Sequence, residues 1–226
     1  MRVLIACEES QRVCMAFREL GHEAFSCDIQ ECSGGHPEWH INSDCLALLN
    51  GDCQFNTQNG EVHIITGKWD LIIAHPPCTY LTVTANRWFD TGKYGKSAWE
   101  RMTERNKAIA FFYQFVMADC DRIAIENPLG VMSTAFRPAD QIIQPYMFGD
   151  AFEKRTCLWL KGLPKLQPTN PVDPPPRRQF KSSNSMPDWY VKLASLPKEE
   201  RSRERSKTFP GIAKAMAEQW GTIENQ

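Results

Sequence analysis

The chain has 226 residues, of which 42% are hydrophobic and 23% are charged, and its formal net charge is −1. These values are ordinary for one soluble globular domain, or one domain with a small appendage, and they exclude an overall basic signature for nucleic acid. No apolar run approaches the ~18 residues that a membrane-spanning helix needs, and residues 2–6 are too short for a signal-peptide core. We therefore expect a cytoplasmic protein without a membrane partner.

The nine cysteines are spread along the chain from Cys7 to Cys157. Their number is odd, and several lie inside apolar, strand-like runs. Free cysteine behaves as a small buried hydrophobe, and cytosolic conditions keep it reduced. We expect most of the nine to belong to the core.

The first half of the chain alternates strand-like and helix-like segments. Strands are predicted over residues 3–6, 23–27, 70–74 and 122–125, and helices over residues 10–20, 46–49 and 99–118. This alternation predicts a parallel sheet with right-handed crossovers. Ligands bind such sheets at the carboxyl ends of the strands.

The pattern changes after Arg155. Residues 156–160 predict a late, antiparallel strand, and residues 164–176 contain six prolines and cannot form regular structure. A final amphipathic helix is predicted over residues 212–220. We divide the chain into a core at 1–160, a proline-rich and basic segment at 161–207, and a C-terminal helix at 208–226 that packs back on the core.

Two segments are candidates for contact with nucleic acid. Between Arg177 and Lys207 there are nine Lys and Arg against four Asp and Glu. Such a local excess, which begins with Arg177 and Arg178, can follow phosphates in a neutral protein; a solvated charged loop is the alternative. Residues 80–98 predict a mobile loop of the kind that closes over a substrate. In it, Trp88 and Tyr94 are candidates for base contact, with ordinary packing as the alternative.

Two motifs follow predicted strands and carry the chemistry. Pro76-Pro77-Cys78 places a thiol behind a stiff turn, and Glu126-Asn127-Pro128 places a carboxylate at the end of another strand. A carboxylate beside an apolar wall tends to have a raised pKa and can share a proton with a ring nitrogen. Addition to C6 of cytosine needs a thiolate together with such a group at N3. A buried cysteine at a strand end and a helix N-cap are the alternatives for the two motifs taken singly.

Taken together, the two motifs resemble those of the cytosine-C5 DNA methyltransferases, in particular the short members common in bacteriophage genomes. The order and spacing agree over about residues 1–160. The resemblance implies a class I methyltransferase (Rossmann-like) α/β fold, with a mostly parallel seven-stranded sheet, helices on both faces and an antiparallel strand near the end. It also implies S-adenosylmethionine as the cofactor and DNA as the partner.

The resemblance assigns catalytic roles to three residues. Cys78 would be the nucleophile that adds to C6, Glu126 would contact N3 and the exocyclic amine, and Arg155 would support the base and phosphate. The methyl group would go to C5 of a cytosine that has been flipped out of the stack.

Cofactor contacts are implied in the same way. Asp28 matches the acid that binds the ribose hydroxyls, and Asp44 matches the acid that reads the adenine amino group. Glu8 could bind the ammonium of the cofactor. The other implied contacts are Cys7, Ile29, Cys45 and Pro76.

The chain departs from the family pattern in several places. The glycine-rich first turn is replaced by Ala6-Cys7-Glu8-Glu9-Ser10, which lacks the glycines that let the family's backbone approach the methionine end of the cofactor. Gly-Pro-Pro-Cys-Gln becomes His75-Pro76-Pro77-Cys78-Thr79, and Glu-Asn-Val becomes Glu126-Asn127-Pro128. Only residues 161–207 are available for a reduced target-recognition segment.

Three alternatives stay open. Cys27, Cys32, His36 and His40 are four potential zinc ligands, but structural sites usually separate their two pairs by a dozen residues or more, so we expect no metal. A thymidylate synthase-like enzyme also uses a Pro-Cys nucleophile, although Thr79 stands where those enzymes have histidine. The altered first turn also permits a catalytically weak DNA-binding module.

Overall fold

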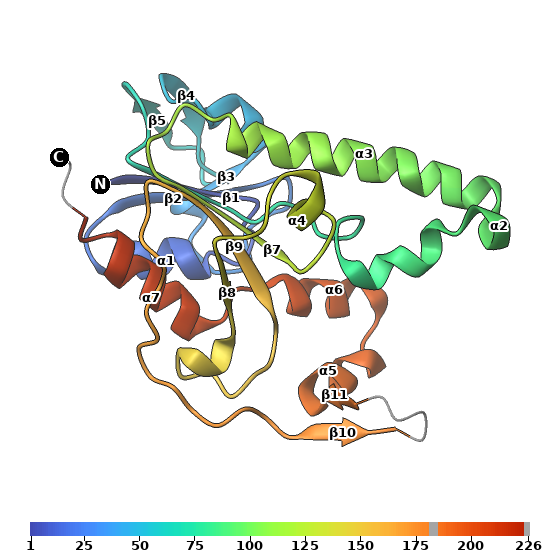
Figure 1. Cartoon of the computed structure of the whole chain (residues 1–226). Helices are drawn as coiled ribbons and strands as arrows, with labels where there is room; N and C mark the ends of the chain where they lie inside the picture. The colour runs from blue at the N-terminus through green and yellow to red at the C-terminus, as the bar shows by residue number, and fades with distance from the viewer. Residues whose placement is uncertain (181–184, 224–226) are drawn as a thin grey trace.

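The structure, a computed structural model, describes residues 1–180 and 185–223. Its centre is a seven-stranded sheet with the order β3-β2-β1-β6-β7-β9-β8 (Figure 1). The strands of this sheet are β1 (Arg2–Ala6), β2 (Glu23–Asp28), β3 (His40–Asn42), β6 (Leu71–Ala74), β7 (Ile123–Pro128), β8 (Gln141–Ile143) and β9 (Thr156–Lys161).

Strands β3, β2, β1, β6 and β7 pair in parallel. Strand β9 lies between β7 and β8 and is antiparallel to both. The expected α/β fold is therefore confirmed: a mostly parallel seven-stranded sheet with one antiparallel strand near the end of the chain.

Helices cover both faces of the sheet (Figure 1). The long helix α3 (Lys96–Val116) lies on one face, and α1 (Arg12–Glu19) and α7 (Pro210–Trp220) lie on the other. Successive residues of a strand point to opposite faces, so each central strand supplies both cores. In β6, for example, Ile72 and Ala74 pack on the side of α3, whereas Leu71 and Ile73 pack on the side of α1 and α7.

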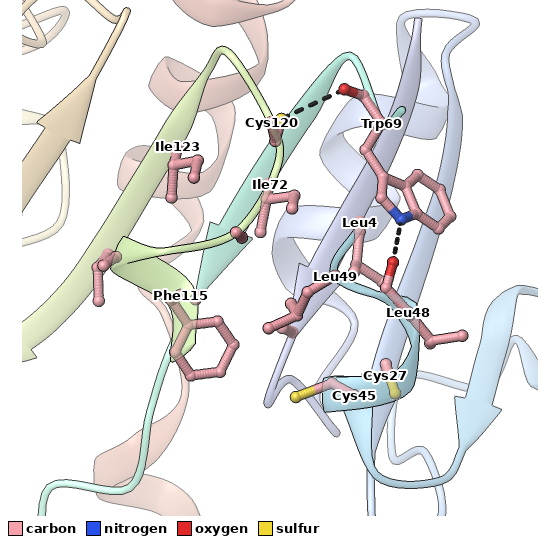
Figure 2. Packing of buried hydrophobic residues seen from close by; sticks show 14 of the residues in the cluster. Leu4, Cys27, Cys45, Leu48, Leu49, Trp69, Ile72, Phe115, Cys120 and Ile123 are labelled. Atoms are coloured by element: carbon pink, nitrogen blue, oxygen red, sulfur yellow. Dashed lines mark hydrogen bonds between the residues drawn. The ribbon is translucent and has the colours of Figure 1, made fainter. Parts of the chain in front are cut away.

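Figure 2 shows the core on the α3 side. The buried indole of Trp69 donates a 2.7 Å hydrogen bond to the carbonyl of Leu48, and the thiol of Cys120 donates a 3.2 Å bond to the carbonyl of Trp69. All nine cysteines are free, and Cys14, Cys27, Cys45, Cys120 and Cys157 are buried. The cysteines are core residues for the most part, as predicted.

The remaining regular elements are short. The helices and 3-10 turns are η1 (Pro37–Trp39), η2 (Cys45–Leu48), η3 (Val83–Phe89), α2 (Thr91–Tyr94), α4 (Met132–Ala135), η4 (Pro145–Met147), α5 (Asp188–Lys192), η5 (Leu193–Ser195) and α6 (Lys198–Ser206). The remaining strands form two hairpins, β4 (Cys53–Asn56) with β5 (Val62–Ile65), and β10 (Arg177–Gln179) with β11 (Ser185–Pro187).

The structure differs from the sequence-based expectations in two places. Most of residues 80–98, which were expected to form a loop, form η3, α2 and the first turn of α3. The β4–β5 hairpin was not predicted; each of its strands has only four residues and a single buried one, Phe55 in β4 and Ile65 in β5. Within residues 1–180 and 185–223, no helix has the length and hydropathy that a membrane span requires.

Candidate active site

The turn that carries Cys78 leaves the carboxyl end of β6. The backbone N–H of His75 still donates to the carbonyl of Ala6, 2.9 Å away, which holds the start of the turn against β1. Two prolines follow, and the carbonyl of Cys78 then accepts the N–H groups of Leu81 and Thr82 at 3.0 and 3.1 Å. Cys78 is exposed at this edge of the sheet.

The segment that leaves β7 is joined to this turn. The side-chain amide of Asn127, which is 2% exposed, donates a 2.6 Å hydrogen bond to the carbonyl of Pro76. Further along, the N–H of Val131 donates to the carbonyl of Leu81 at 2.8 Å, beside an isolated bridge at Gly130. A Cβ atom on Gly130 would lie only 1.9 Å from that carbonyl oxygen, so this close approach requires glycine. The two motif-bearing segments are thus fixed to one another.

Glu126 forms a buried pair with His75. Nδ1 of His75 lies 3.0 Å from Oε2 of Glu126, and the two side chains are 9% and 11% exposed. Burial by itself would raise the pKa of Glu126, but the hydrogen bond from His75 and the charge of Lys154 outweigh it, so this pKa is lowered. The sequence-based expectation of a raised pKa is wrong, because it considered the apolar wall without these two partners.

The pKa of the Cys78 thiol is raised above its ordinary value. Although the residue is exposed overall, surrounding protein atoms restrict hydration of the thiolate, and the negative charge of Glu126 adds to the effect, whereas Lys154 opposes it. The charge of Glu126 therefore affects the ionisation of the Cys78 thiol. The structure brings the two principal predicted residues to the same edge of the sheet.

His75 and Lys154 were not assigned roles from the sequence. Their signals were available: His75 stands in the Pro-Pro-Cys motif where the family has glycine, and Lys154 precedes the predicted Arg155. Arg155 itself is exposed. Burial and the charge of Glu126 raise the pKa of Cys157, and the charge of Arg155 opposes this rise, whereas Lys154 is the cation that acts on Cys78 and Glu126.

The predicted cofactor residues lie at the carboxyl ends of β1, β2 and β3, apart from Pro76, which follows β6. Sγ of Cys7 is 4.0 Å from Sγ of Cys45, and the charge of Asp28 helps to raise the pKa of Cys7 after the larger effects of Cys45 and burial. Ile29, next to Asp28, is 79% exposed and could cover a flat aromatic ring. Asp44 is exposed, and its Oδ1 accepts the N–H of Leu46 at the start of η2. Asp28 and Asp44 both add to the effect of burial and of Cys45 in raising the pKa of the Cys27 thiol, so the two carboxylates act on the same buried residue.

The turn after β1 achieves a tight bend without glycine. Cys7 and Gln11 have φ values of 61° and 58°, the left-handed region that glycine adopts most readily. The buried side chain of Gln11 holds this turn to the loop before β3, because it accepts the N–H of His36 at 3.0 Å and donates to its carbonyl at 2.8 Å. Gly34 packs so closely here that a Cβ would lie 2.6 Å from that of Gln11.

The two glutamates of this turn differ in their partners. Glu8 accepts the N–H groups of Val13 and Cys14 at 2.7 and 3.2 Å, so it serves as an acceptor for the first turn of α1. Burial raises the pKa of Glu8. Glu9 is 7% exposed, and neither of its carboxylate oxygens has a hydrogen-bond partner among the described residues. Glu9 is therefore the carboxylate of this turn that still lacks a donor.

Trp88 and Tyr94 lie on an arm formed by η3, α2 and the start of α3, which extends away from the sheet (Figure 1). Their ring centroids are 5.2 Å apart. The guanidinium of Arg87 lies 4.7 Å from the ring of Trp88, and the ammonium of Lys93 lies 5.3 Å from that of Tyr94. Aromatic rings interleaved with cations are typical of surfaces that bind single-stranded nucleic acid.

Arg177 and Arg178 lie on β10 and are exposed. Arg177 forms an ion pair with Glu153, and Arg178 forms one with Asp188 at 2.6 Å. A phosphate would therefore have to compete with these carboxylates. Lys181, a further basic residue of this segment, lies outside the described residues.

The two histidines among the four potential zinc ligands have other partners. Both ring nitrogens of His40 are engaged, with Oγ of Ser26 and the carbonyl of Gln30, each at 2.9 Å. His36 stacks on Trp39 at 3.9 Å and bonds to Glu38. Over the part of the chain that is described, no group of three or more His, Cys, Asp or Glu is arranged to hold a metal ion.

No family model matches the chain, and no curated protein is found to be similar to it. One similar solved structure is that of an E. coli protein proposed to be a DNA modification methyltransferase and encoded within a prophage. The two chains share 15% identity with a TM-score of 0.45, over 77% of this chain and 52% of the other. The match thus spans about half of the length of that protein, and a similarity this limited assigns no activity.

Proposed function

We propose that this protein transfers a methyl group from S-adenosylmethionine to C5 of cytosine in DNA, through a covalent bond between Cys78 and C6. One observation carries the proposal: Cys78 and Glu126 lie at the carboxyl ends of the neighbouring strands β6 and β7, and the charge of Glu126 acts on the Cys78 thiol. A thiolate and a carboxylate in reach of one ring are what addition to a pyrimidine needs.

The protein residues would divide the reaction as follows. The Cys78 thiolate adds to C6, so a C–S bond forms and the electrons of the 5,6 double bond move into the ring toward N3. Glu126 would accept a hydrogen bond from the amino group of the base, and the positive charge of Lys154, which acts on both Cys78 and Glu126, would offset the negative charge that develops on the ring. After C5 takes the methyl group, a base removes the proton from C5. Cys78 then leaves as thiolate, which restores the aromatic ring.

The residues at β1, β2 and β3 fit the proposed cofactor. S-adenosylmethionine, when bound, supplies the electrophilic methyl group. Asp28 offers a carboxylate for two ribose hydroxyls, and exposed Ile29 offers an apolar surface for adenine. Glu9, buried with no donor for either oxygen, fits the ammonium of the cofactor better than Glu8, whose oxygens already accept the N–H groups of α1.

DNA is the proposed partner. Extracting a base from the stack costs a few kcal/mol, and stacking on Trp88 or Tyr94 would offset part of that cost. The cations along the arm, such as Arg87 and Lys93, would contact phosphates. Any preference for a particular DNA sequence would come from the short segment at 161–207.

The test is incubation with tritium-labelled S-adenosylmethionine and unmethylated DNA, followed by digestion and nucleoside analysis. Label in 5-methylcytosine with the wild-type protein, lost in Cys78→Ala, is the expected result. Cys53→Ala is the matched control, because Cys53 is a half-buried free cysteine on the separate β4–β5 hairpin.

Two other results would point to a different function. Cofactor binding without transfer to DNA would point to another acceptor, such as a free pyrimidine nucleotide. DNA binding without any cofactor binding would favour the binding module.

A further inference from the structure

The pair of His75 and Glu126 joins two neighbouring strands beside Cys78. His75 follows β6 directly, and Glu126 lies within β7. The Nδ1–Oε2 distance of 3.0 Å and the burial of both side chains make this a fixed contact rather than a surface ion pair. Oε1 of Glu126 has no hydrogen-bond partner among the described residues.

The charge state of the pair follows from its surroundings. Four charged or titratable groups at three neighbouring strands act on it: Glu8 after β1, Cys78 after β6, Lys154 before β9, and Cys157 in β9. The pKa of Glu126 is lowered, so the group is a carboxylate at neutral pH and can only accept hydrogen bonds. Nδ1 of His75 must therefore donate to Oε2.

We infer that His75 is a positioning residue, which holds Oε2 of Glu126 and leaves Oε1 to accept a hydrogen bond from the exocyclic amine of the target pyrimidine. The site would then be selective for a hydrogen-bond donor on C4 of the ring. Cytosine has an amino group there, whereas uracil and thymine have an oxygen that a carboxylate repels. This inference rests on the proposed function and adds to it the residue that makes the site selective for an amino-pyrimidine.

The test compares methyl transfer to DNA with transfer to the same DNA carrying deoxyuridine at the methylated position. For the wild-type protein we expect a preference for cytosine on the order of 100-fold or more, because a site built around a substrate N–H rejects the analogue that lacks it. His75→Leu removes the donor. We expect the rate of methyl transfer to cytosine, and the preference for cytosine over uracil, each to fall at least about 10-fold.

The pH profile provides a readout that a purely structural role would not move. Without the hydrogen bond from His75, the pKa of Glu126 rises, so the acid limb of the rate profile moves to higher pH. His75→Asn is the matched control, since its side-chain NH2 can replace Nδ1–H as a donor. We expect it to keep the preference and the acid limb within a few-fold of the wild type.

The outcomes are separable. Wild-type protein that transfers no methyl group to cytosine would refute the proposed function itself. Wild-type activity combined with an unchanged preference and pH profile in folded His75→Leu would refute only the role of His75. If His75→Leu does not fold, His75→Asn still tests the role of His75. A folded His75→Asn that has lost the preference for cytosine would refute that role, because this variant keeps a hydrogen-bond donor.

Discussion

The side-chain amide of Asn127 and the carbonyl oxygen of Pro76 are joined by a buried 2.6 Å hydrogen bond across β6 and β7. Asn127 follows Glu126, and Pro76 precedes Cys78 by two residues, so this bond contributes directly to the spacing of the thiol and the carboxylate. Asparagine is required at this place for its N–H donor, not for a helix N-cap, because β7 continues through Pro128.

Replacing Asn127 with Ala should therefore affect both stability and activity. It leaves the carbonyl of Pro76 unpaired, which we expect to lower the free energy of unfolding by ~1–3 kcal/mol. Methyl transfer should fall more than this loss explains, since Cys78 and Glu126 lose their common anchor. Denaturant unfolding and transfer assays measure the two effects. Asn56→Ala, at an exposed position on β4, is the control; equal behaviour of both variants would refute the role of Asn127.

The reactivity of Cys78 should report the charges around it. Because its pKa is raised, the thiol form dominates at neutral pH, and alkylation by iodoacetamide should speed up as pH rises through that pKa. Glu126→Gln removes a charge that disfavours the thiolate, so the profile should move to lower pH and alkylation at pH 7 should be faster. Lys154→Gln removes a favourable charge and should slow it.

Mass spectrometry of the Cys78 peptide measures these rates. Cys53, in the same digest, responds to burial and Asp52 and should keep its rate in both variants. Shifts of the same sign in Glu126→Gln and Lys154→Gln would contradict the electrostatic account.

Glu8 and Glu9 should respond in opposite ways to replacement by glutamine. Glu9→Gln removes a buried carboxylate that has no donor, so we expect the unfolding free energy without ligand to rise by ~1–3 kcal/mol. Glu8→Gln offers one oxygen to two helix N–H groups, so we expect a loss of ~0.5–2 kcal/mol.

Calorimetry then tests the cofactor role of Glu9. A lost charge-assisted hydrogen bond of ~1.5–3 kcal/mol corresponds to an S-adenosylmethionine affinity about 10- to 100-fold lower in Glu9→Gln. Wild-type affinity in that variant would mean that the ammonium is held elsewhere.

Gly130 should not tolerate a side chain. Its Cβ would lie 1.9 Å from the carbonyl oxygen of Leu81, so Gly130→Ala must push the loop after Cys78 away from β7. We expect a loss of ~1–3 kcal/mol in stability, together with a loss of methyl transfer. Gly92→Ala is the control, because the added Cβ meets only a side-chain oxygen of Asp90 at 3.3 Å. A stable, active Gly130→Ala would show that the close approach is not needed.

Trp88 on the arm should contribute to DNA binding. Stacking of a base on an aromatic ring is worth ~1–3 kcal/mol, so Trp88→Ala should weaken binding accordingly in fluorescence anisotropy. Ile64→Ala on the β4–β5 hairpin removes an apolar side chain that is 69% exposed, against 39% for Trp88, and should change nothing. If wild type and Trp88→Ala bind DNA with equal affinity, the arm is not part of the DNA interface.

The sequence by itself predicted the sheet and the edge at which the site lies. Apolar runs such as residues 70–74 and 122–125 mark strands buried on both faces, and helices between them require parallel strands. Because parallel strands end at a common edge, Cys78 and Glu126 could be expected there together. These are local signals, since they depend on the order of residues along one segment.

Only the tertiary structure decided how the groups at that edge are partnered. His75 and Glu126 are 51 positions apart, as are Pro76 and Asn127. The lowered pKa of Glu126, the use of Glu8 by α1 and the unpartnered state of Glu9 all depend on such neighbours. A pKa is set by charges and donors that folding brings within a few ångströms, and no pattern along one strand contains them.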